Sequence, residues 1–310
     1  MWRCQTKPLD RQRFGVEIDG RVVTVWNFEE SSPRPYFYPI RGPLGGELTR
    51  MGHPGAYDHD HHRSVWFAHN KVMGVDFWAD ESSARIKQTR WLSIDDGDER
   101  TAFSVDLVWQ DGHDPAPLLN QRLIVVAWRD EHEQWQLEIQ TDLVAEGGQI
   151  ELMKSNYGVL AVRMAKSISA YFGGGVISNS EGAVGESEIF GRPSKWMDYS
   201  GTVGVGQGTE RKQVDAGITY FDHAENTSYP SKWHVREDGW MGASLCRDSG
   251  VVLDPGDRLR LRYLLDIHQG RYDEERALRL SKEFCERPAW QLVKSTRPHI
   301  KWEIQSSETS

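Results

Sequence analysis

Alternating apolar and polar side chains mark the stretch Gln134-Trp-Gln-Leu-Glu-Ile-Gln-Thr-Asp-Leu143. In an extended chain the apolar residues share one side, and the polar residues Gln134, Gln136, Glu138 and Gln140 share the other. An antiparallel sheet that packs one face on a core and leaves the other in water produces this pattern. The stretch therefore predicts a strand of an antiparallel sheet with one solvated face.

Short runs of the same kind, each bounded by turn-forming residues, recur along the chain. They cover residues 90–94, 102–109, 121–128, 158–164, 217–221 and 258–267. Near the start, Asp19-Gly20 joins two β-branched runs within residues 14–26, which is a strong hairpin signal. We therefore predict an all-β protein: a single large antiparallel β-sandwich domain over residues 1–305, followed by a disordered tail over residues 306–310.

One helix is predicted near the end of the sequence. Asp273 is a suitable N-cap, and the acidic residues after it complement the helix dipole in the first turn. Pro288 would end the helix. The residues expected on its apolar face are Ala277, Leu278, Ser281, Phe284 and Cys285.

The composition excludes several classes of partner. A net charge of -9 argues against nucleic acid, because phosphate binding needs a concentrated basic face. No apolar stretch approaches the length of a membrane span, and the first residues do not form a secretory signal, so we expect a cytoplasmic protein that contacts no membrane. The three cysteines are far apart in the sequence, which fits reduced thiols.

Five of the eleven histidines fall within the stretch His53-Pro-Gly-Ala-Tyr-Asp58-His59-Asp60-His61-His62-Arg63-Ser-Val-Trp-Phe-Ala-His69. Imidazoles and carboxylates at this density can bind a divalent metal ion, transfer protons near neutral pH, or hydrogen-bond a polyhydroxylated ligand. If the loop is extended, His59 and His61 lie on one side, where they could share a metal ion with His69 as a third ligand. This set of residues fits zinc, manganese or iron equally well, and an ordinary polar loop is the alternative.

Aromatic residues beside polar ones point to a sugar. The chain has 13 tryptophans, and Trp78, Trp196 and Trp233 stand next to charged residues, which suits stacking on the apolar face of a sugar ring. Burial between two sheets is the alternative for each ring. Arg41 and Arg63 could hold a carboxylate or an anionic sugar substituent, or could form salt bridges with the abundant acidic residues.

Several motifs resemble a known bacterial family, the one named after methane oxygenase PmoA. They are Pro35-Tyr-Phe-Tyr-Pro39-Ile-Arg41-Gly-Pro43, the histidine-rich stretch from Asp58, Gly74-Val-Asp76-Phe-Trp78, Asn156-Tyr-Gly158, Asn179-Ser-Glu181-Gly182, Lys195-Trp196-Met-Asp198-Tyr199, Phe221-Asp222-His223 and Trp233-His234-Val-Arg236. The resemblance covers most of residues 12–270 and implies a role beside carbohydrate catabolism, with no assigned mechanism. A membrane monooxygenase subunit would need a bilayer-spanning segment, which the sequence lacks. The strand count suits a galactose-mutarotase-like supersandwich.

We therefore expect an enzyme that cleaves or rearranges a small-molecule saccharide, as a glycoside hydrolase, lyase or epimerase, by acid–base chemistry of histidines and carboxylates, with or without a divalent metal ion. The alternatives are a non-catalytic sugar-binding or sensing domain and a metal-dependent oxygenase. The candidate catalytic residues are Asp58, His61, His62, Asp222 and His223. The candidate substrate contacts are Arg41, His53, Arg63, His69, Asp76, Trp78, Glu181, Trp196, Asp198, Trp233, His234 and Arg236.

Overall fold

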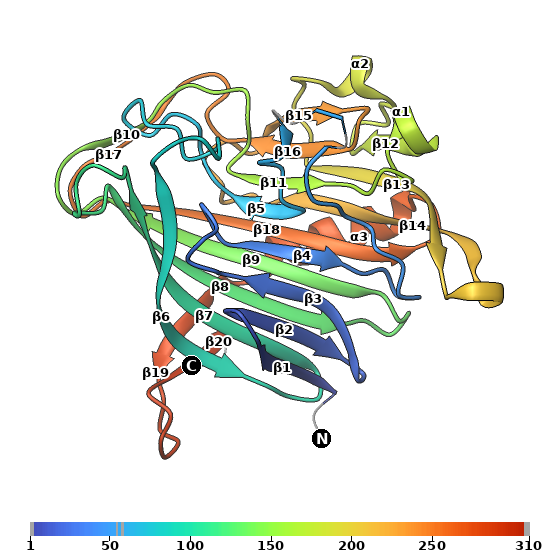
Figure 1. The fold of residues 1–310 in the computed structure, drawn as a ribbon, viewed down its shortest axis with the longest axis horizontal. Helices are drawn as coiled ribbons and strands as arrows, with labels where there is room; N and C mark the ends of the chain where they lie inside the picture. The colour runs from blue at the N-terminus through green and yellow to red at the C-terminus, as the bar shows by residue number, and fades with distance from the viewer. Residues whose placement is uncertain (1–2, 54, 57–58, 307–310) are drawn as a thin grey trace.

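Two eight-stranded sheets, stacked in two layers, make up most of the computed structural model, which describes residues 3–53, 55–56 and 59–306 (Figure 1). The first sheet runs in the spatial order β1 (Cys4–Leu9), β2 (Arg13–Ile18), β3 (Arg21–Asn27), β4 (Tyr36–Ile40), β5 (Val65–Phe67), β11 (Leu160–Arg163), β16 (Trp240–Ser244) and β15 (Lys232–Arg236). The second runs β12 (Val176–Asn179), β13 (Trp196–Val205), β14 (Lys212–Asp222), β18 (Arg258–Gln269), β9 (Trp135–Val144), β8 (Leu119–Arg129), β7 (Arg100–Gln110) and β6 (Arg85–Asp95).

The smaller elements are two two-stranded sheets and a few short helices. One small sheet pairs β10 (Ile150–Leu152) with β17 (Val251–Leu253), and the other pairs β19 (Trp290–Lys294) with β20 (Trp302–Ser306). The helices are α1 (Ala170–Gly173), α2 (Glu186–Ile189), the 3-10 turn η2 (Gly208–Glu210) and α3 (Glu274–Glu286). Neighbouring strands in both large sheets pair antiparallel, which confirms the predicted all-β antiparallel architecture.

The predicted hairpin at Asp19-Gly20 is present as β2 and β3. Asp19 and Gly20 have φ values of 48° and 77°, as a two-residue turn of the primed type requires. Between the sheets the core is largely aromatic on this side: the rings of Trp26 and Phe37 from the first sheet lie 6.2 and 6.4 Å from Phe103 of the second. This packing of apolar inner faces joins the two layers into a sandwich.

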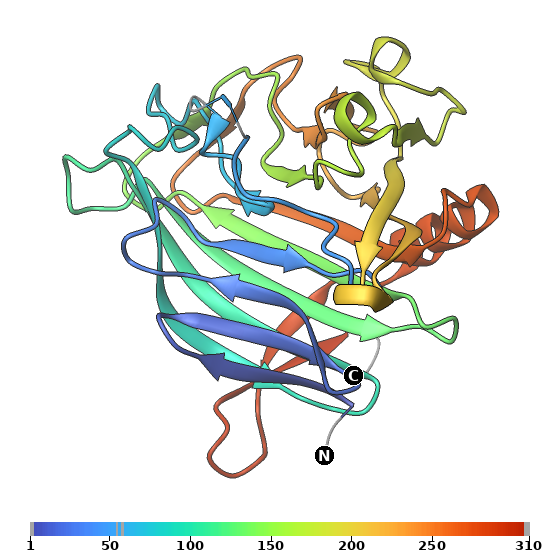
Figure 2. The same ribbon diagram turned by 45° about the vertical axis from the view of Figure 1, so that its right-hand side comes forward.

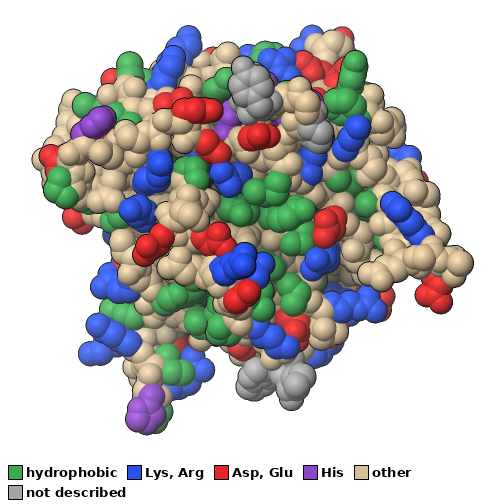
Figure 3. Space-filling view, viewed as in Figure 1, with side chains coloured by type: hydrophobic (Ala, Val, Ile, Leu, Met, Phe, Trp, Pro, Cys, Tyr) green, Lys and Arg blue, Asp and Glu red, His purple; other side chains and the backbone are tan. Residues whose placement is uncertain are grey.

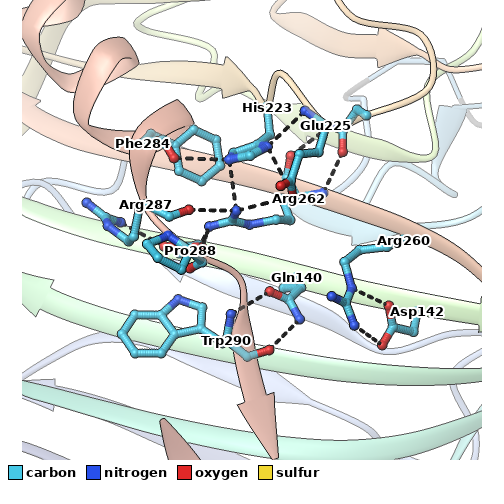
Figure 4. Close-up of polar contacts among 12 residues, drawn as sticks. Gln140, Asp142, His223, Glu225, Arg260, Arg262, Phe284, Arg287, Pro288 and Trp290 are labelled. Atoms are coloured by element: carbon cyan, nitrogen blue, oxygen red, sulfur yellow. Dashed lines mark hydrogen bonds and ion pairs between the residues drawn. The ribbon is translucent and has the colours of Figure 1, made fainter. Parts of the chain in front are cut away.

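Along β9 the outer face of the second sheet is not solvated between Gln136 and Gln140, and this corrects the expectation drawn from the alternation in that strand. Gln136, Glu138 and Gln140 are each at most 1% exposed. The Gln140 amide exchanges two hydrogen bonds of 2.9 Å with the backbone of Trp290 in β19 (Figure 4). Gln136 donates to Asp266 at 2.6 Å. A polar face therefore lies buried beneath the C-terminal segment, with its polar groups bonded to one another.

The C-terminal segment covers that face with α3 and the β19–β20 ribbon (Figure 2). Asp273 accepts a hydrogen bond of 3.0 Å from the Arg276 backbone N–H, which confirms the predicted N-cap. The buried side of α3 includes Leu280, whereas Leu278 is 53% exposed, so the predicted apolar face was wrong at that position. Ser306 belongs to β20 and not to a tail, and residues 307–310 lie outside the described residues.

Candidate functional site

The candidate site lies on the outer face of the first sheet, around β5, β11, β16 and β15. Long loops gather over this face (Figures 1 and 2). Strand pairing sets Trp66 opposite Ala161, Ala161 opposite Gly242, and Gly242 opposite His234. Directly paired residues point to the same face, so these four form one row across the sheet. The row ends in two large rings and has two small residues between them.

Trp240 occupies the centre of this face. It precedes Gly242 by two residues, so both point to the same side of β16. A Cβ atom added at Gly242 would lie 3.5 Å from Trp240 Nε1, which shows that the indole lies over the glycine. In the next row, Trp240 pairs with Arg163 of β11 and with Arg236 of β15.

The histidine-rich loop packs onto this indole through His62. The His62 ring lies 4.4 Å from Trp240 and stacks on Trp66 at 5.6 Å. His61 and His59 then surround His62 at ring distances of 4.4 and 5.1 Å. Three imidazoles from one short loop therefore meet two tryptophans of the sheet.

Further rings extend the cluster along the sheet. Trp78 lies 5.3 Å from Trp240, and Tyr157 stacks on Trp78 at 5.4 Å. His234 lies 5.4 Å from Tyr157. We call this group the ring cluster; its members are His53, His59, His61, His62, Trp66, Trp78, Tyr157, His234 and Trp240.

Burial divides the ring cluster into a floor and a rim. His62, Trp66, Trp78, His234 and Trp240 are buried, whereas His53, His59, His61 and Tyr157 are partly exposed. Histidine side chains are visible at the surface in the upper part of Figure 3, among acidic and basic side chains. Tyr157 covers the predicted Trp78, so Tyr157 is the more exposed ring of this pair.

Burial keeps the imidazoles of the floor uncharged. It lowers the pKa of His62 far below its ordinary value, and the neighbouring His61 and Arg163 add to the shift. The pKa of His61 is also lowered, by burial and by Arg34, and the pKa of His234 falls to about 4, by burial and by Arg236. Each ring at pH 7 therefore has one nitrogen that donates a hydrogen bond and one that accepts.

Three buried nitrogens of the floor have no hydrogen-bond partner within residues 3–53, 55–56 and 59–306. They are Nδ1 of His62 and the indole Nε1 atoms of Trp66 and Trp240. A buried polar group without a partner costs about 1–3 kcal/mol. The three nitrogens lie in mutually contacting rings, where Trp66 and Trp240 offer hydrogen-bond donors and the His62 nitrogen can donate or accept.

Asp238 connects one end of the ring cluster to Arg163. Its carboxylate accepts hydrogen bonds of 2.7 and 3.1 Å from the fully buried Arg163 and lies 3.5 Å from Nε2 of His53. Burial raises the pKa of Asp238, but the hydrogen bonds and charge of Arg163 outweigh this and hold the pKa below its ordinary value. An ionised carboxylate beside an exposed imidazole suits proton exchange at His53.

The structure brings eight of the predicted site residues to this region. His53, His59, His61, His62, Trp78 and His234 belong to the ring cluster, and Arg63 and Arg236 border it. Arg63 pairs with Asp80 at 2.5 Å, and Arg236 pairs with Glu186 at 2.6 Å, so both take the salt-bridge role. The candidate Asp58 lies outside the described residues.

Four predicted residues of the first half and its neighbouring loops have local structural roles instead. His69 is buried and its Nε2 lies 2.9 Å from the Met153 carbonyl oxygen, away from the other imidazoles. Asp76 accepts backbone N–H groups of its own turn, Arg41 pairs with Glu47 at 3.4 Å, and Glu181 is exposed. In the described part of the chain, no group of three His, Cys, Asp or Glu side chains is arranged to hold a metal ion, so the set His59, His61 and His69 is not assembled there.

Five others lie in or under the second sheet or in the core, which corrects their assignment to the site. Trp233 is fully buried and donates to the Ser194 carbonyl, and Trp196 is buried beneath α3. Asp198 pairs with His268 at 2.9 Å, and Asp222 binds Asn226 and the Ser231 backbone. The polar groups of these side chains bond to other residues of the fold, away from the histidine loop in the sequence. Nothing in the sequence distinguishes them from catalytic residues.

His223 is also structural. Its Nδ1 accepts the Glu225 backbone N–H at 3.0 Å, so a neutral ring carries its proton on Nε2 and donates it to the Phe284 carbonyl of α3 at 3.0 Å (Figure 4). Burial, together with Arg262, lowers its pKa to about 4. The predicted catalytic histidine therefore fastens α3 to the sheet.

Sequence reasoning did not select several residues of the site. They are Arg50, Trp66, Tyr157, Arg163, Asp238 and Trp240. Tyr157 stands in the motif Asn156-Tyr-Gly158, and Trp66 lies four residues after His62. Their convergence depends on the order β5-β11-β16-β15, which joins strands distant in the chain.

Comparison with known proteins assigns the chain to a family. A search of curated proteins gives no match. Among solved structures, the chain is similar to the GalM/aldose epimerase homologue from C. elegans, with 8% identity and a TM-score of 0.33 over 87% of this chain and 99% of that one, a score that supports no inference about activity. No helix in the described residues is long and apolar enough to cross a membrane. Residues 13–282 match the profile of DUF6807, and the chain therefore belongs to this family of unknown function.

Proposed function

We propose that the ring cluster is a saccharide site and that the protein cleaves or rearranges its sugar by acid–base chemistry. The observation that carries the proposal is the set of buried nitrogens in His62, Trp66 and Trp240 that have no hydrogen-bond partner among the described residues. Sugar hydroxyl groups both donate and accept hydrogen bonds, so they match a mixture of indole donors and a neutral imidazole. The half-buried ring of Tyr157 supplies an apolar surface for the C–H face of a sugar.

The proposed roles follow from position. His62, kept neutral by burial, holds the sugar through hydrogen bonds, and His61 lies beside it at the rim. His53, beside the Asp238 carboxylate, exchanges a proton with the substrate, and Asp238 orients the imidazole. The motifs that resemble the PmoA family also favour a carbohydrate context.

Binding and turnover on a defined saccharide panel test the proposal. We expect His62→Ala to reduce affinity or turnover at least about tenfold, because one hydrogen-bonded group of the floor is lost. His132→Ala is the matched control, since its imidazole is exposed beside Glu131 and outside the ring cluster. Calorimetry measures binding, NMR of the sugar detects products, and circular dichroism verifies the fold.

The outcomes separate the candidate functions. Saturable binding without product after long incubation would assign a sugar-binding or sensing module. Unchanged binding and turnover in a folded His62→Ala protein would show that the ring cluster is not the site.

A further inference from the structure

One arginine beside the ring cluster has buried N–H groups that the protein does not use. Arg50 is fixed by its backbone, which donates to the Arg163 carbonyl and accepts from Ser64, both at 3.0 Å. Its Nη2 donates to the Asp238 backbone carbonyl at 2.9 Å, whereas Nε and Nη1 are buried without a partner in the described ranges. Burial, reinforced by Arg163, lowers the pKa of Arg50 to about 10, so the side chain remains charged at pH 7.

Arg50 has no counter-ion among the described residues. The Asp238 carboxylate is bound to Arg163 in a two-point contact, and Arg50 forms no salt bridge with a carboxylate of the described residues. Lys166 lies 5.2 Å from the Phe172 ring, which Arg50 also approaches, so a second cation lies near. A half-buried guanidinium without a counter-ion is unfavourable.

Arg50 lies within reach of a ligand on the ring cluster. Its Cζ is 5.8 Å from the Phe172 ring, and Phe172 is 5.6 Å from His53. His53 in turn lies 5.8 Å from His59. Arg50 therefore lies beside the rim of the ring cluster, with Phe172 between it and His53.

We propose that the ligand is an acidic saccharide, a hexuronate or an oligouronide, whose carboxylate pairs with Arg50. This inference rests on the proposed saccharide function and names its substrate class. A carboxylate brings one negative charge, which matches the single charge of the Arg50 guanidinium, whereas a phosphate brings nearly two. Charge-assisted hydrogen bonds of this kind are about twice as strong as neutral ones.

Calorimetry with three ligands of equal length tests the inference on the unmodified protein: an oligogalacturonide, its methyl ester and the neutral galacto-oligosaccharide. We expect the acidic form to bind about tenfold to a hundredfold more tightly than the other two. Arg50→Gln should remove this preference and keep the affinity for the neutral sugar. Arg50→Lys should retain part of the preference, and Arg21→Gln, at an exposed arginine, should behave as the unmodified protein.

Each result has one reading. Equal affinity for acidic and neutral forms overturns the acidic-substrate inference and leaves the saccharide site in place. A preference that survives Arg50→Gln shows that another group binds the carboxylate. Failure of all three ligands to bind, together with failure of the broader panel, overturns both proposals. The methyl ester removes the charge from the ligand, so the test stands even where an Arg50 variant does not fold.

Discussion

Glu138 should be among the most costly side chains of this protein to remove. Its two carboxylate oxygens lie 3.0 Å from Arg262 Nη2 and 2.7 Å from Arg287 Nη1, and the side chains of Glu138 and Arg262 are both fully buried. Arg287 is the C-cap residue of α3, so this carboxylate joins the C-terminal segment to the sheet. Glu138→Ala would leave Arg262 buried with its main counter-ion gone.

The expected loss of unfolding free energy is about 3–5 kcal/mol, the range for breaking one partner of a buried ion pair. Urea unfolding followed by tryptophan fluorescence and far-UV circular dichroism measures it. Glu138→Gln, which retains hydrogen bonding, should lose less and serves if the alanine variant does not fold. The double variant Glu138→Leu with Arg262→Met should recover most of the loss, because no uncompensated charge remains.

The matched control is Glu286→Ala on α3. Glu286 and Lys282 are 4.0 Å apart and mostly exposed, so this change should alter the unfolding free energy by no more than about 0.5 kcal/mol. Equal urea midpoints for Glu138→Ala and Glu286→Ala, or a loss below about 1 kcal/mol at Glu138, would refute the reasoning.

Two further predictions concern stability. His223 and His234 each have a folded pKa of about 4, lowered chiefly by burial, so between about pH 6.5 and pH 4 the unfolded chain binds protons that the folded chain does not. The unfolding free energy should therefore fall as the pH drops through that window, by about 1.4 kcal/mol per pH unit for each group. Urea titrations at several pH values should show that the unfolding free energy of His223→Gln depends less steeply on pH than that of the unmodified protein. At Gly173 an added Cβ would lie 1.9 Å from the Ser167 carbonyl oxygen, so Gly173→Ala should lower the unfolding free energy by about 1–3 kcal/mol in thermal or urea unfolding. The control is Gly148→Ala, where a Cβ meets nothing within 4 Å and stability should change by less than about 0.5 kcal/mol.

The alternation in β9 shows what a sequence can and cannot predict. It identified the strand and its inner face, because a period of two depends only on local geometry. It placed Gln136, Glu138 and Gln140 in water, whereas the structure buries them under a segment that begins more than 130 residues later. Polar residues that satisfy one another look the same in sequence as polar residues that face solvent.

The same limit applied to the site. The density of histidines located the loop, and His53, His59, His61 and His62 do lie together. The indole that receives them, Trp240, comes from a strand some 180 residues downstream, and no spacing rule connects the two. His223, in contrast, resembled a catalytic residue until its hydrogen bond to α3 was visible.

Gly242 offers a way to re-engineer this protein with one codon. A methyl group there would meet Trp240 Nε1 at 3.5 Å and the Leu160 carbonyl oxygen at 3.4 Å, which are ordinary contacts, but a branched side chain has no such room. Trp240 touches His62, Trp66 and Trp78, so tilting its indole would move neighbours drawn from three separate segments at once. A small library at this one position should therefore retune ligand selectivity while every polar group that contacts the ligand keeps its identity.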